Sequence, residues 1–144
     1  METLEQVLKN WEKDSIIDQT EPGNELIRIP VLHNKYLTAL TKNKLASKKA
    51  HNNYLKMRKV RWEYYTGKLT QEELEHYGWE PFQFTLKSDI NTYLEADDIL
   101  IPLLEKKVYH DEIVSVCESI MGELKSRTFQ LRDFISWEKF IGGQ

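Results

Sequence analysis

The chain has 144 residues, of which 40% are hydrophobic and 30% are charged, and its formal net charge is −3. This length corresponds to about one domain of roughly 100 to 200 residues, and a modest apolar share is typical of a helical chain with a large surface. A single cysteine excludes an internal disulfide and a multi-cysteine metal cluster, and no stretch approaches the roughly 20 apolar residues of a membrane span, so we expect a soluble cytoplasmic protein.

The first predicted element is a short helix near the N-terminus. Apolar residues recur there at spacings of three and four, at Leu4, Val7, Leu8 and Trp11. The segment METLEQVLKNWEKD is acidic and lacks the apolar core of a signal peptide. Turn-forming residues in DSIIDQTEPGN predict the end of this helix, and Pro30 fits the first position of the next one.

The second predicted helix is long, because neither proline nor glycine interrupts the chain from Val31 to about Tyr65. Its apolar face, at 100° per residue, consists of Leu32, Tyr36, Ala39, Ala46, Ala50, Tyr54, Met57 and Tyr64. A helix of this length spans roughly 50 Å. Gly67 is a suitable stop just past its end.

Positive charge is concentrated in this helix. Residues 35–68 hold ten Lys and Arg against one acid, Glu63, whereas residues 1–34 hold three against seven and residues 69–144 hold seven against fifteen. A seven-residue spacing, which drifts only about 20° per step, aligns Lys35, Lys42, Lys49 and Lys56 in a ridge that Lys59 extends. A solvated face is the ordinary alternative, but such a face usually includes acids for pairing, and this ridge has no such partners. We therefore interpret the ridge as an anion-binding surface.

Arg61 falls within the apolar arc, near Tyr54 and Tyr64. An arginine among tyrosines can offer its planar fork to a phosphate while the rings stack on unpaired bases. The alternative is a guanidinium that stacks on its own tyrosines or pairs with an acid across an interface. The residues alone leave these two readings open.

Residues 69–97 are mixed in character. TQEELEHYG predicts one or two capped helical turns, and GWEPFQFTLKSD predicts a loop or a short extended segment before a brief helix from Ile90 to Glu95. Asp97 and Asp98 are candidate N-caps for the element that follows.

The last predicted helix runs from about Pro102 to Phe140. Its apolar stripe is Ile113, Cys117, Ile120, Leu124, Leu131 and Phe134, and other sides add Phe129, Ile135, Trp137, Phe140 and Ile141. An apolar surface wider than one arc predicts self-association. Packing against the long helix of the same chain is the alternative.

No residue pattern points to catalysis, to a metal or to a cofactor. The sequence has no Gly-rich phosphate loop, and its histidines are scattered without a ligand spacing. Cys117 lies on the apolar stripe and reads as a core residue. Asp97, Asp98 and neighbouring acids leave a small metal-dependent nuclease as a weaker alternative.

Two segments, LKMRKVRWEYYTGK and GELKSRTFQLRDFISWEKFIGG, carry a family resemblance. The chain resembles the UvsY family of recombination mediators of T4-like phages, whose basic motif has the form LKxRxxYYSGR and whose tail contains IKSRxF. By position, Lys59 and Arg61 match the lysine and arginine that contribute to single-stranded DNA binding, and Tyr64 and Tyr65 match the tyrosine pair. Trp62, Arg58 and Lys68 depart from the motif, although Lys68 keeps the charge of the arginine it replaces.

The resemblance implies a non-enzymatic accessory factor of phage recombination and repair, acting in the host cytoplasm. It implies a ring-like homo-oligomer, heptameric where known and held partly by the C-terminal helix. The implied partners are single-stranded DNA, a RecA-like recombinase and a single-strand-binding protein. The main alternative is a helical adaptor whose basic ridge docks an acidic protein partner.

We therefore expect one all-α domain over residues 1–144, with a basic helix within residues 1–68 and an oligomerisation helix within residues 98–144. The expected DNA-binding residues are Lys49, Lys56, Arg58, Lys59, Arg61, Tyr64, Tyr65 and Lys68. The expected oligomerisation residues are Ile113, Cys117, Ile120, Leu124, Leu131, Phe134, Ile135 and Phe140.

Overall fold

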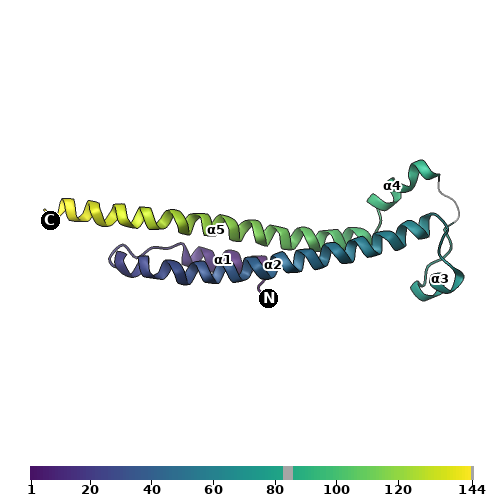
Figure 1. Cartoon of the computed structure of the whole chain (residues 1–144), viewed down its shortest axis with the longest axis horizontal. Helices are drawn as coiled ribbons and strands as arrows, with labels where there is room; N and C mark the ends of the chain where they lie inside the picture. The colour runs from purple at the N-terminus through teal and green to yellow at the C-terminus, as the bar shows by residue number, and fades with distance from the viewer. Residues whose placement is uncertain (83–85, 144) are drawn as a thin grey trace. The chain divides into compact units, whose positions relative to one another are not determined.

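The structure is a computed structural model, and it describes residues 1–82 and 86–143. Within these ranges all regular elements are helical (Figure 1), which confirms the predicted all-α class. The elements are α1 (Leu4–Asp14), α2 (Pro22–Tyr65), α3 (Gln71–Tyr77), the 3-10 helix η1 (Lys87–Asp89), α4 (Ile90–Glu95) and α5 (Leu100–Ile141). None of the described helices is both long enough and apolar enough to cross a membrane.

The residues group into two compact units. The first unit comprises Met1–Leu45 and Tyr109–Gln144, and the second comprises Ala46–Val108. The unit boundaries fall inside the two long helices, not at the change of charge near residue 69. Each unit therefore contains one part of α2 and one part of α5.

The ends of α1 follow from local hydrogen bonds. The Thr3 hydroxyl accepts from the Gln6 amide while the Gln6 side chain accepts from the Thr3 amide, so the two residues form a capping box. The helix ends at Asp14, the first residue of the predicted turn segment. The predicted first helix is confirmed.

The start of α2 differs from the prediction. Pro22 is its first residue and Pro30 lies inside it, so the prediction that Pro30 begins the helix was wrong. A proline at the first helical position loses no helical bond, whereas Pro30 cannot donate to the carbonyl of Leu26. Pro30 is exposed, where water can take the place of the missing donor.

The end of α2 is as predicted. The helix stops at Tyr65, and its 44 residues correspond to about 66 Å at 1.5 Å per residue. Gly67 has a φ of 71°, and the amides of Gly67 and Lys68 donate to the carbonyls of Tyr64 and Glu63. This pair of bonds is a Schellman motif, which needs the positive φ that glycine adopts freely.

Two of the short elements between residues 69 and 97, α3 and α4, match the prediction, whereas the 3-10 helix η1 lies where a loop or a short extended segment was predicted. Thr70 and Glu73 form a capping box at the start of α3, and Gly78, with a φ of 70°, ends it. The predicted brief helix is α4, with the predicted bounds. Part of the predicted loop or extended segment, residues 83–85, lies outside the described residues.

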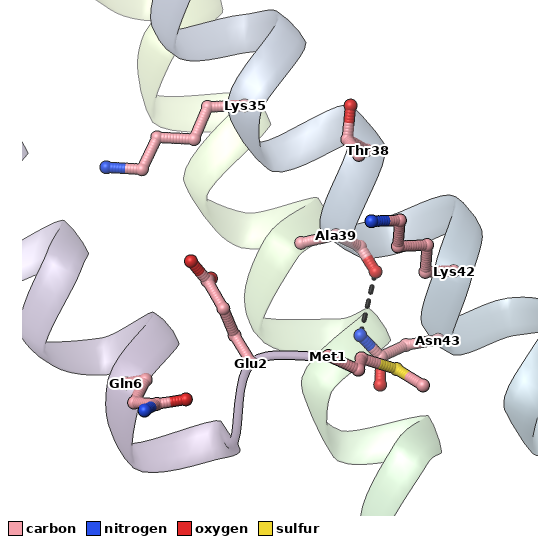
Figure 2. A pocket seen from close by; sticks show the side chains of 8 residues that line it. All are labelled: Met1, Glu2, Gln6, Lys35, Thr38, Ala39, Lys42 and Asn43. Carbon is pink, nitrogen blue, oxygen red and sulfur yellow. Dashed lines mark hydrogen bonds between the residues drawn. The ribbon is translucent and has the colours of Figure 1, made fainter.

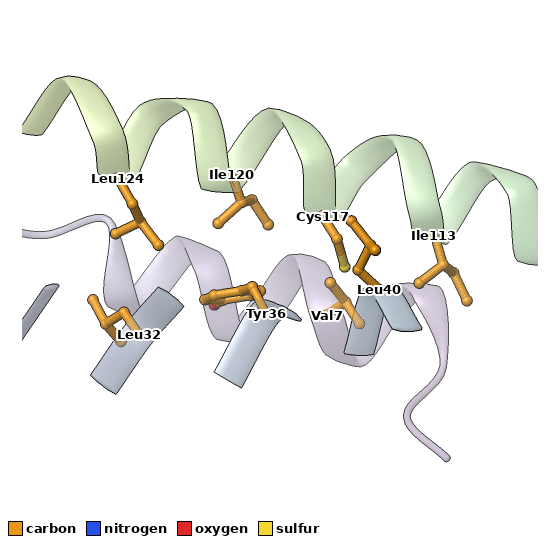
Figure 3. Close-up of a cluster of buried hydrophobic side chains, with 8 residues drawn as sticks. All are labelled: Val7, Leu32, Tyr36, Leu40, Ile113, Cys117, Ile120 and Leu124. Atoms are coloured by element: carbon orange, nitrogen blue, oxygen red, sulfur yellow. The ribbon is translucent and has the colours of Figure 1, made fainter. Parts of the chain in front are cut away.

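The core of the first unit is made by α1, α2 and α5 (Figure 3). Apolar side chains recur on each helix at spacings of three and four residues, so each helix has one apolar face, and these faces pack against one another. The cluster consists of Val7, Leu32, Tyr36, Leu40, Ile113, Cys117, Ile120 and Leu124. Their burial explains why α1 is held against the two long helices.

A polar network completes the first unit. The buried Asp14 carboxylate accepts from the Tyr36 hydroxyl at 2.8 Å and from the side chains of Arg28 and Lys35. Arg127 donates to the backbone carbonyls of Asp14 and Ser15, at 3.2 and 3.0 Å. Arg127 belongs to the KSRTF segment that carried the family resemblance, and in the structure it fixes the end of α1 to α5.

The core of the second unit is smaller. Ile90 and Leu94 of α4 pack with Leu100 of α5, and the α2 residues Tyr54, Met57 and Tyr65 pack against this cluster. The C-terminal part of α2 is therefore held in place by the segment that follows it in sequence.

Candidate nucleic-acid interface

All eight predicted DNA-binding residues belong to the second unit, on the C-terminal part of α2 or just beyond it. The structure divides them into two groups. One group is exposed and carries free positive charge, and the other is packed into the unit.

The exposed group contains Lys49, Lys56, Arg58 and Lys59 on α2, and Lys68 just beyond the helix. Among the described residues, no ion pair joins the first three of these to an acid. Lys59 lies 4.0 Å from the Glu63 carboxylate, but its side chain is 78% exposed, and exposed pairs of this length contribute little. The four side chains on α2 give the helix a cationic surface that can reach solvent.

The first unit holds the remaining lysines of the predicted ridge. Lys35 lies 2.6 Å from the Asp14 carboxylate, so the statement that the ridge lacks acidic partners was wrong for Lys35, and for Lys59 at its longer distance. The acid comes from α1, which the spacing within one helix could not reveal. Lys42 is exposed.

Lys35 and Lys42 also line a cavity of about 570 Å³ in the first unit. Figure 2 shows them with Thr38, Ala39 and Asn43 of α2 and with Met1, Glu2 and Gln6. The Asn43 amide donates to the Ala39 carbonyl at 2.8 Å, so its nitrogen is occupied. With Glu2 present and Lys35 neutralised by Asp14, this cavity is less cationic than the exposed surface of the second unit.

Arg61 belongs to the packed group. Its Nε donates to Asp97 Oδ2 at 2.7 Å and its Nη2 donates to the Tyr65 hydroxyl at 3.1 Å. The Tyr65 hydroxyl donates to the same carboxylate oxygen at 2.6 Å. The other oxygen, Oδ1, accepts from the amides of Ile99 and Leu100, so Asp97 is also the predicted N-cap of α5.

The guanidinium of Arg61 is surrounded by rings. Its central carbon lies 4.4 Å from the Tyr64 centroid, 4.5 Å from that of Trp79 and 5.0 Å from that of Tyr65. Only 11% of the Arg61 side chain is exposed. The alternative that the sequence left open, a stacked and paired guanidinium, therefore describes Arg61 in this structure, with its acid supplied by the same chain.

Hydrogen bonding sets the protonation states in this network. Burial by itself raises the pKa of Asp97, but the hydrogen bonds from Tyr65, Arg61 and two backbone amides outweigh it and hold the pKa below its usual range. Burial, together with the Asp97 carboxylate, raises the pKa of Tyr65. Arg61 and Asp97 thus form a buried charged pair at neutral pH.

The tyrosine pair packs on its own chain. The Tyr64 ring contacts those of Tyr65, Trp79 and Phe82, and the Tyr65 ring contacts those of Phe82 and Tyr93. The Tyr64 hydroxyl donates to the Glu80 carbonyl at 2.6 Å. The ring faces that were expected to stack on bases are engaged within the second unit.

Trp62 and Lys68 remain at the surface. Trp62 is 36% exposed, and the Lys68 ammonium lies 4.2 Å from its ring centroid. The Schellman motif at Gly67 turns the chain so that Lys68 comes back over the last turn of α2. An aromatic ring and a flexible cation therefore share one exposed site.

The predicted oligomerisation residues also fall into groups. Ile113, Cys117, Ile120 and Leu124 belong to the core of the first unit, with no more than 3% exposed. For these four, the structure matches the alternative of packing within the same chain. Leu131 is also buried, Phe134 and Ile135 are partly buried, and Phe140 is 74% exposed.

The end of α5 carries further exposed apolar side chains. Phe129 is 60%, Trp137 57% and Ile141 62% exposed, and the rings of Trp137 and Phe140 stack at 5.8 Å. Trp137, Phe140 and Ile141 lie beyond Leu131, the last buried residue described in α5, whereas Phe129 lines a cavity with Pro30 of α2. These four apolar side chains are exposed in this structure.

Two of the groups considered for catalysis, Asp97 and Cys117, are engaged structurally. Within residues 1–82 and 86–143, no cluster of three or more His, Cys, Asp or Glu is placed to hold a metal ion. Both oxygens of Asp97 already accept hydrogen bonds. Burial raises the pKa of Cys117, with a smaller effect of Glu2, which disfavours the thiolate.

Comparison with known proteins adds a family and a fold. Residues 10–144 match the family model described as "Recombination, repair and ssDNA binding protein UvsY". No curated protein matches the chain.

Among solved structures, the chain is similar to the recombination mediator protein UvsY of bacteriophage T4. For the crystal form called lattice type II the TM-score is 0.87 at 22% identity, with 99% of each chain covered. For lattice type IV it is 0.85 at 21% identity, covering 97% of this chain and 99% of the other. At this level of identity, the likeness establishes the shared fold.

Proposed function

The chain belongs to the UvsY family of recombination, repair and single-stranded-DNA-binding proteins, and from this membership we propose that it is a non-catalytic recombination mediator that binds single-stranded DNA. In this proposal it promotes loading of a RecA-like recombinase onto strands that a single-strand-binding protein already coats. The strand lies along the cationic surface of the second unit.

One observation carries this proposal: the exposed cations of α2 lack acidic partners of their own. Lys49, Lys56 and Arg58 have no ion pair with a described acid, and Lys59 has only the long contact with Glu63. Phosphates of a single strand can therefore neutralise these side chains without first breaking a strong pair.

A single copy offers few contacts. With about five phosphate contacts, affinity falls steeply with salt, because log K drops by about 0.7 per contact for each tenfold rise in salt concentration. Several copies acting together restore affinity through effective concentration. The exposed residues Phe129, Trp137, Phe140 and Ile141 support a homo-oligomer, which we propose to be a heptameric ring.

The mediator step follows from holding the strand at many points. A strand gripped by several copies can be bent or wrapped in a form that the resident binding protein grips less well. Recombinase can then nucleate on it. None of these steps requires the mediator to hydrolyse a nucleotide.

The test has two parts. Titration of oligothymidylates of increasing length across a salt series should show affinity that rises with length and falls with salt. Adding the protein to a recombinase and a strand precoated with single-strand-binding protein should shorten the lag in filament assembly. An adaptor that docks an acidic protein would show no length-dependent strand binding, and that outcome would overturn the proposal.

A further inference from the structure

Trp62 stands apart from the other aromatic residues of the second unit. It is 36% exposed, and among the described residues no other aromatic ring contacts its ring. Tyr93 is also exposed, at 42%, but its ring packs on those of Tyr65 and Phe82. Among the aromatic side chains that the structure describes in this unit, Trp62 is therefore the one whose ring has no contact with another aromatic ring.

The surroundings of Trp62 are cationic. Arg58 and Lys59 precede it by four and three residues on α2, which places both beside it on the helix surface. Lys68 lies over its ring, with the ammonium 4.2 Å from the centroid. An exposed indole ringed by three cations provides both a stacking face for a base and charges for the flanking phosphates.

We propose that Trp62 is the residue on which an unpaired base of the bound strand stacks, and that Lys68 moves from the ring to a neighbouring phosphate when this happens. The inference rests on the proposed function, because it assigns a base-contacting residue within the same surface. It replaces Tyr64 and Tyr65, the stacking residues expected from the sequence, whose rings are engaged internally.

In this proposal the Lys68 ammonium has a favourable partner both in the free protein and in the complex. In the free protein the ammonium covers one face of the indole through a cation–π contact, which shields that face from water. In the complex a base takes the same face, and the ammonium finds a phosphate instead. The backbone of Lys68 stays fixed, since its amide donates to the Glu63 carbonyl at 2.8 Å, while its side chain is free to move.

Two strands of equal length separate stacking from charge: an oligothymidylate, and a strand whose sugars carry no bases. Trp62→Leu should bind the oligothymidylate at least about fivefold more weakly than the unaltered protein, because stacking on one aromatic contributes about 1 kcal/mol or more. Its affinity for the abasic strand and its salt slope on both strands should not change.

Two matched variants complete the test. Trp62→Phe keeps a flat ring and should retain most of the preference for the base-bearing strand. Lys68→Gln should reduce the salt slope on the oligothymidylate by about 0.7, and it should affect binding of the abasic strand less, because no base displaces the ammonium from the ring there. Circular dichroism and light scattering should show the same fold and the same assembly for every variant.

The outcomes distinguish this inference from the proposed function. Oligothymidylate binding by Trp62→Leu at unaltered strength, or an equal loss on both strands, overturns the assignment of Trp62 and leaves single-strand binding intact. An unaltered protein that binds neither strand overturns the proposed function, and this inference with it.

Discussion

Arg61 Nε donates to Asp97 Oδ2 at 2.7 Å across a separation of 36 residues, and the Asp97 side chain is completely buried. This bond joins the last turns of α2 to the residue that caps α5. The residue that the family resemblance assigns to DNA binding is thus, in this structure, a structural centre of the second unit.

The first prediction concerns stability. Arg61→Ala leaves the Asp97 carboxylate buried without its ionic partner, and breaking a buried pair in this way costs about 3 to 5 kcal/mol of unfolding free energy. Urea unfolding monitored by circular dichroism measures this loss. Lys59→Ala, on the exposed face, is the matched control and should change the free energy by less than about 0.5 kcal/mol. A loss below about 1 kcal/mol for Arg61→Ala would show that the pair is not a structural centre.

The second prediction distinguishes a residue that contacts the DNA strand from a residue that holds the binding surface in position. Lys59→Gln removes one phosphate contact and should lower the slope of log K against log salt by about 0.7. Arg61→Gln should weaken strand binding and leave the slope unchanged. In the unaltered protein the Arg61 guanidinium stays bound to Asp97, so it supports binding by holding the end of α2 in place and not by contacting a phosphate. Lys9→Gln, on the exposed face of α1 where Lys9 pairs with Glu5, is the control and should alter neither quantity. A reduced slope for Arg61→Gln would mean that Arg61 leaves Asp97 and contacts the strand directly.

The sequence predicted the helices well because their signals are local. Thr3 with Gln6 and Thr70 with Glu73 are capping boxes, and the positive φ of Gly67 ends α2 where the helical pattern stops. Pro30 was misplaced because an exposed proline can remain inside a long helix that packing stabilises elsewhere.

The sequence could not predict which charged residues pair through space. Asp14 and Lys35 are 21 residues apart on different helices, and Arg61 of α2 is 36 residues from Asp97, which precedes α5. Periodicity within one helix carries no information about such pairs. Trp79 likewise has no sequence signal that connects it with Arg61, although the structure places its ring 4.5 Å from the guanidinium.

The third prediction concerns acid. Hydrogen bonds and nearby cations hold the pKa of Asp97 and of Asp14 below the ordinary value of 3.8, although burial of each carboxyl acts in the opposite direction. A lowered folded-state pKa gives stability that is fully present above the unfolded-state value and is lost as pH falls through the folded-state value. The free energy of unfolding should therefore be flat from about pH 7 to 5 and should fall below about pH 4.

Asp97→Asn is the variant that tests this assignment. It should have a lower free energy of unfolding than the unaltered protein at neutral pH. Below about pH 4 its free energy of unfolding should fall less steeply, because only one of the two carboxyls, that of Asp14, is left to bind a proton. Urea unfolding across the pH series measures both. The same acid dependence in Asp97→Asn and in the unaltered protein would exclude Asp97 as a source of it.

The fourth prediction separates the two parts of α5. Ile120 is 3% exposed in the core of the first unit, whereas Trp137 and Phe140 are 57% and 74% exposed. Ile120→Ala should cost about 2 to 5 kcal/mol of unfolding free energy through the cavity it leaves. Trp137→Ala with Phe140→Ala should leave the helical content of the chain unchanged but reduce the mass of the assembly measured by light scattering.

Truncation offers a further check on this division, provided that the cut spares the first unit. A cut after Ser126 would remove Arg127 and free the end of α1 from α5, so a smaller assembly could then result from a damaged protomer. A cut after Asp133 keeps Arg127 and the buried Leu131 while removing Trp137 and Phe140. If this shorter chain is folded but smaller in assembly and weaker in salt-sensitive strand binding, the exposed end of α5 is what brings the cationic surfaces together. A folded chain that keeps its full assembly would place the contact between copies elsewhere, for which the apolar cavity of about 720 Å³ lined by Pro30, Met121 and Phe129 is the next surface to alter.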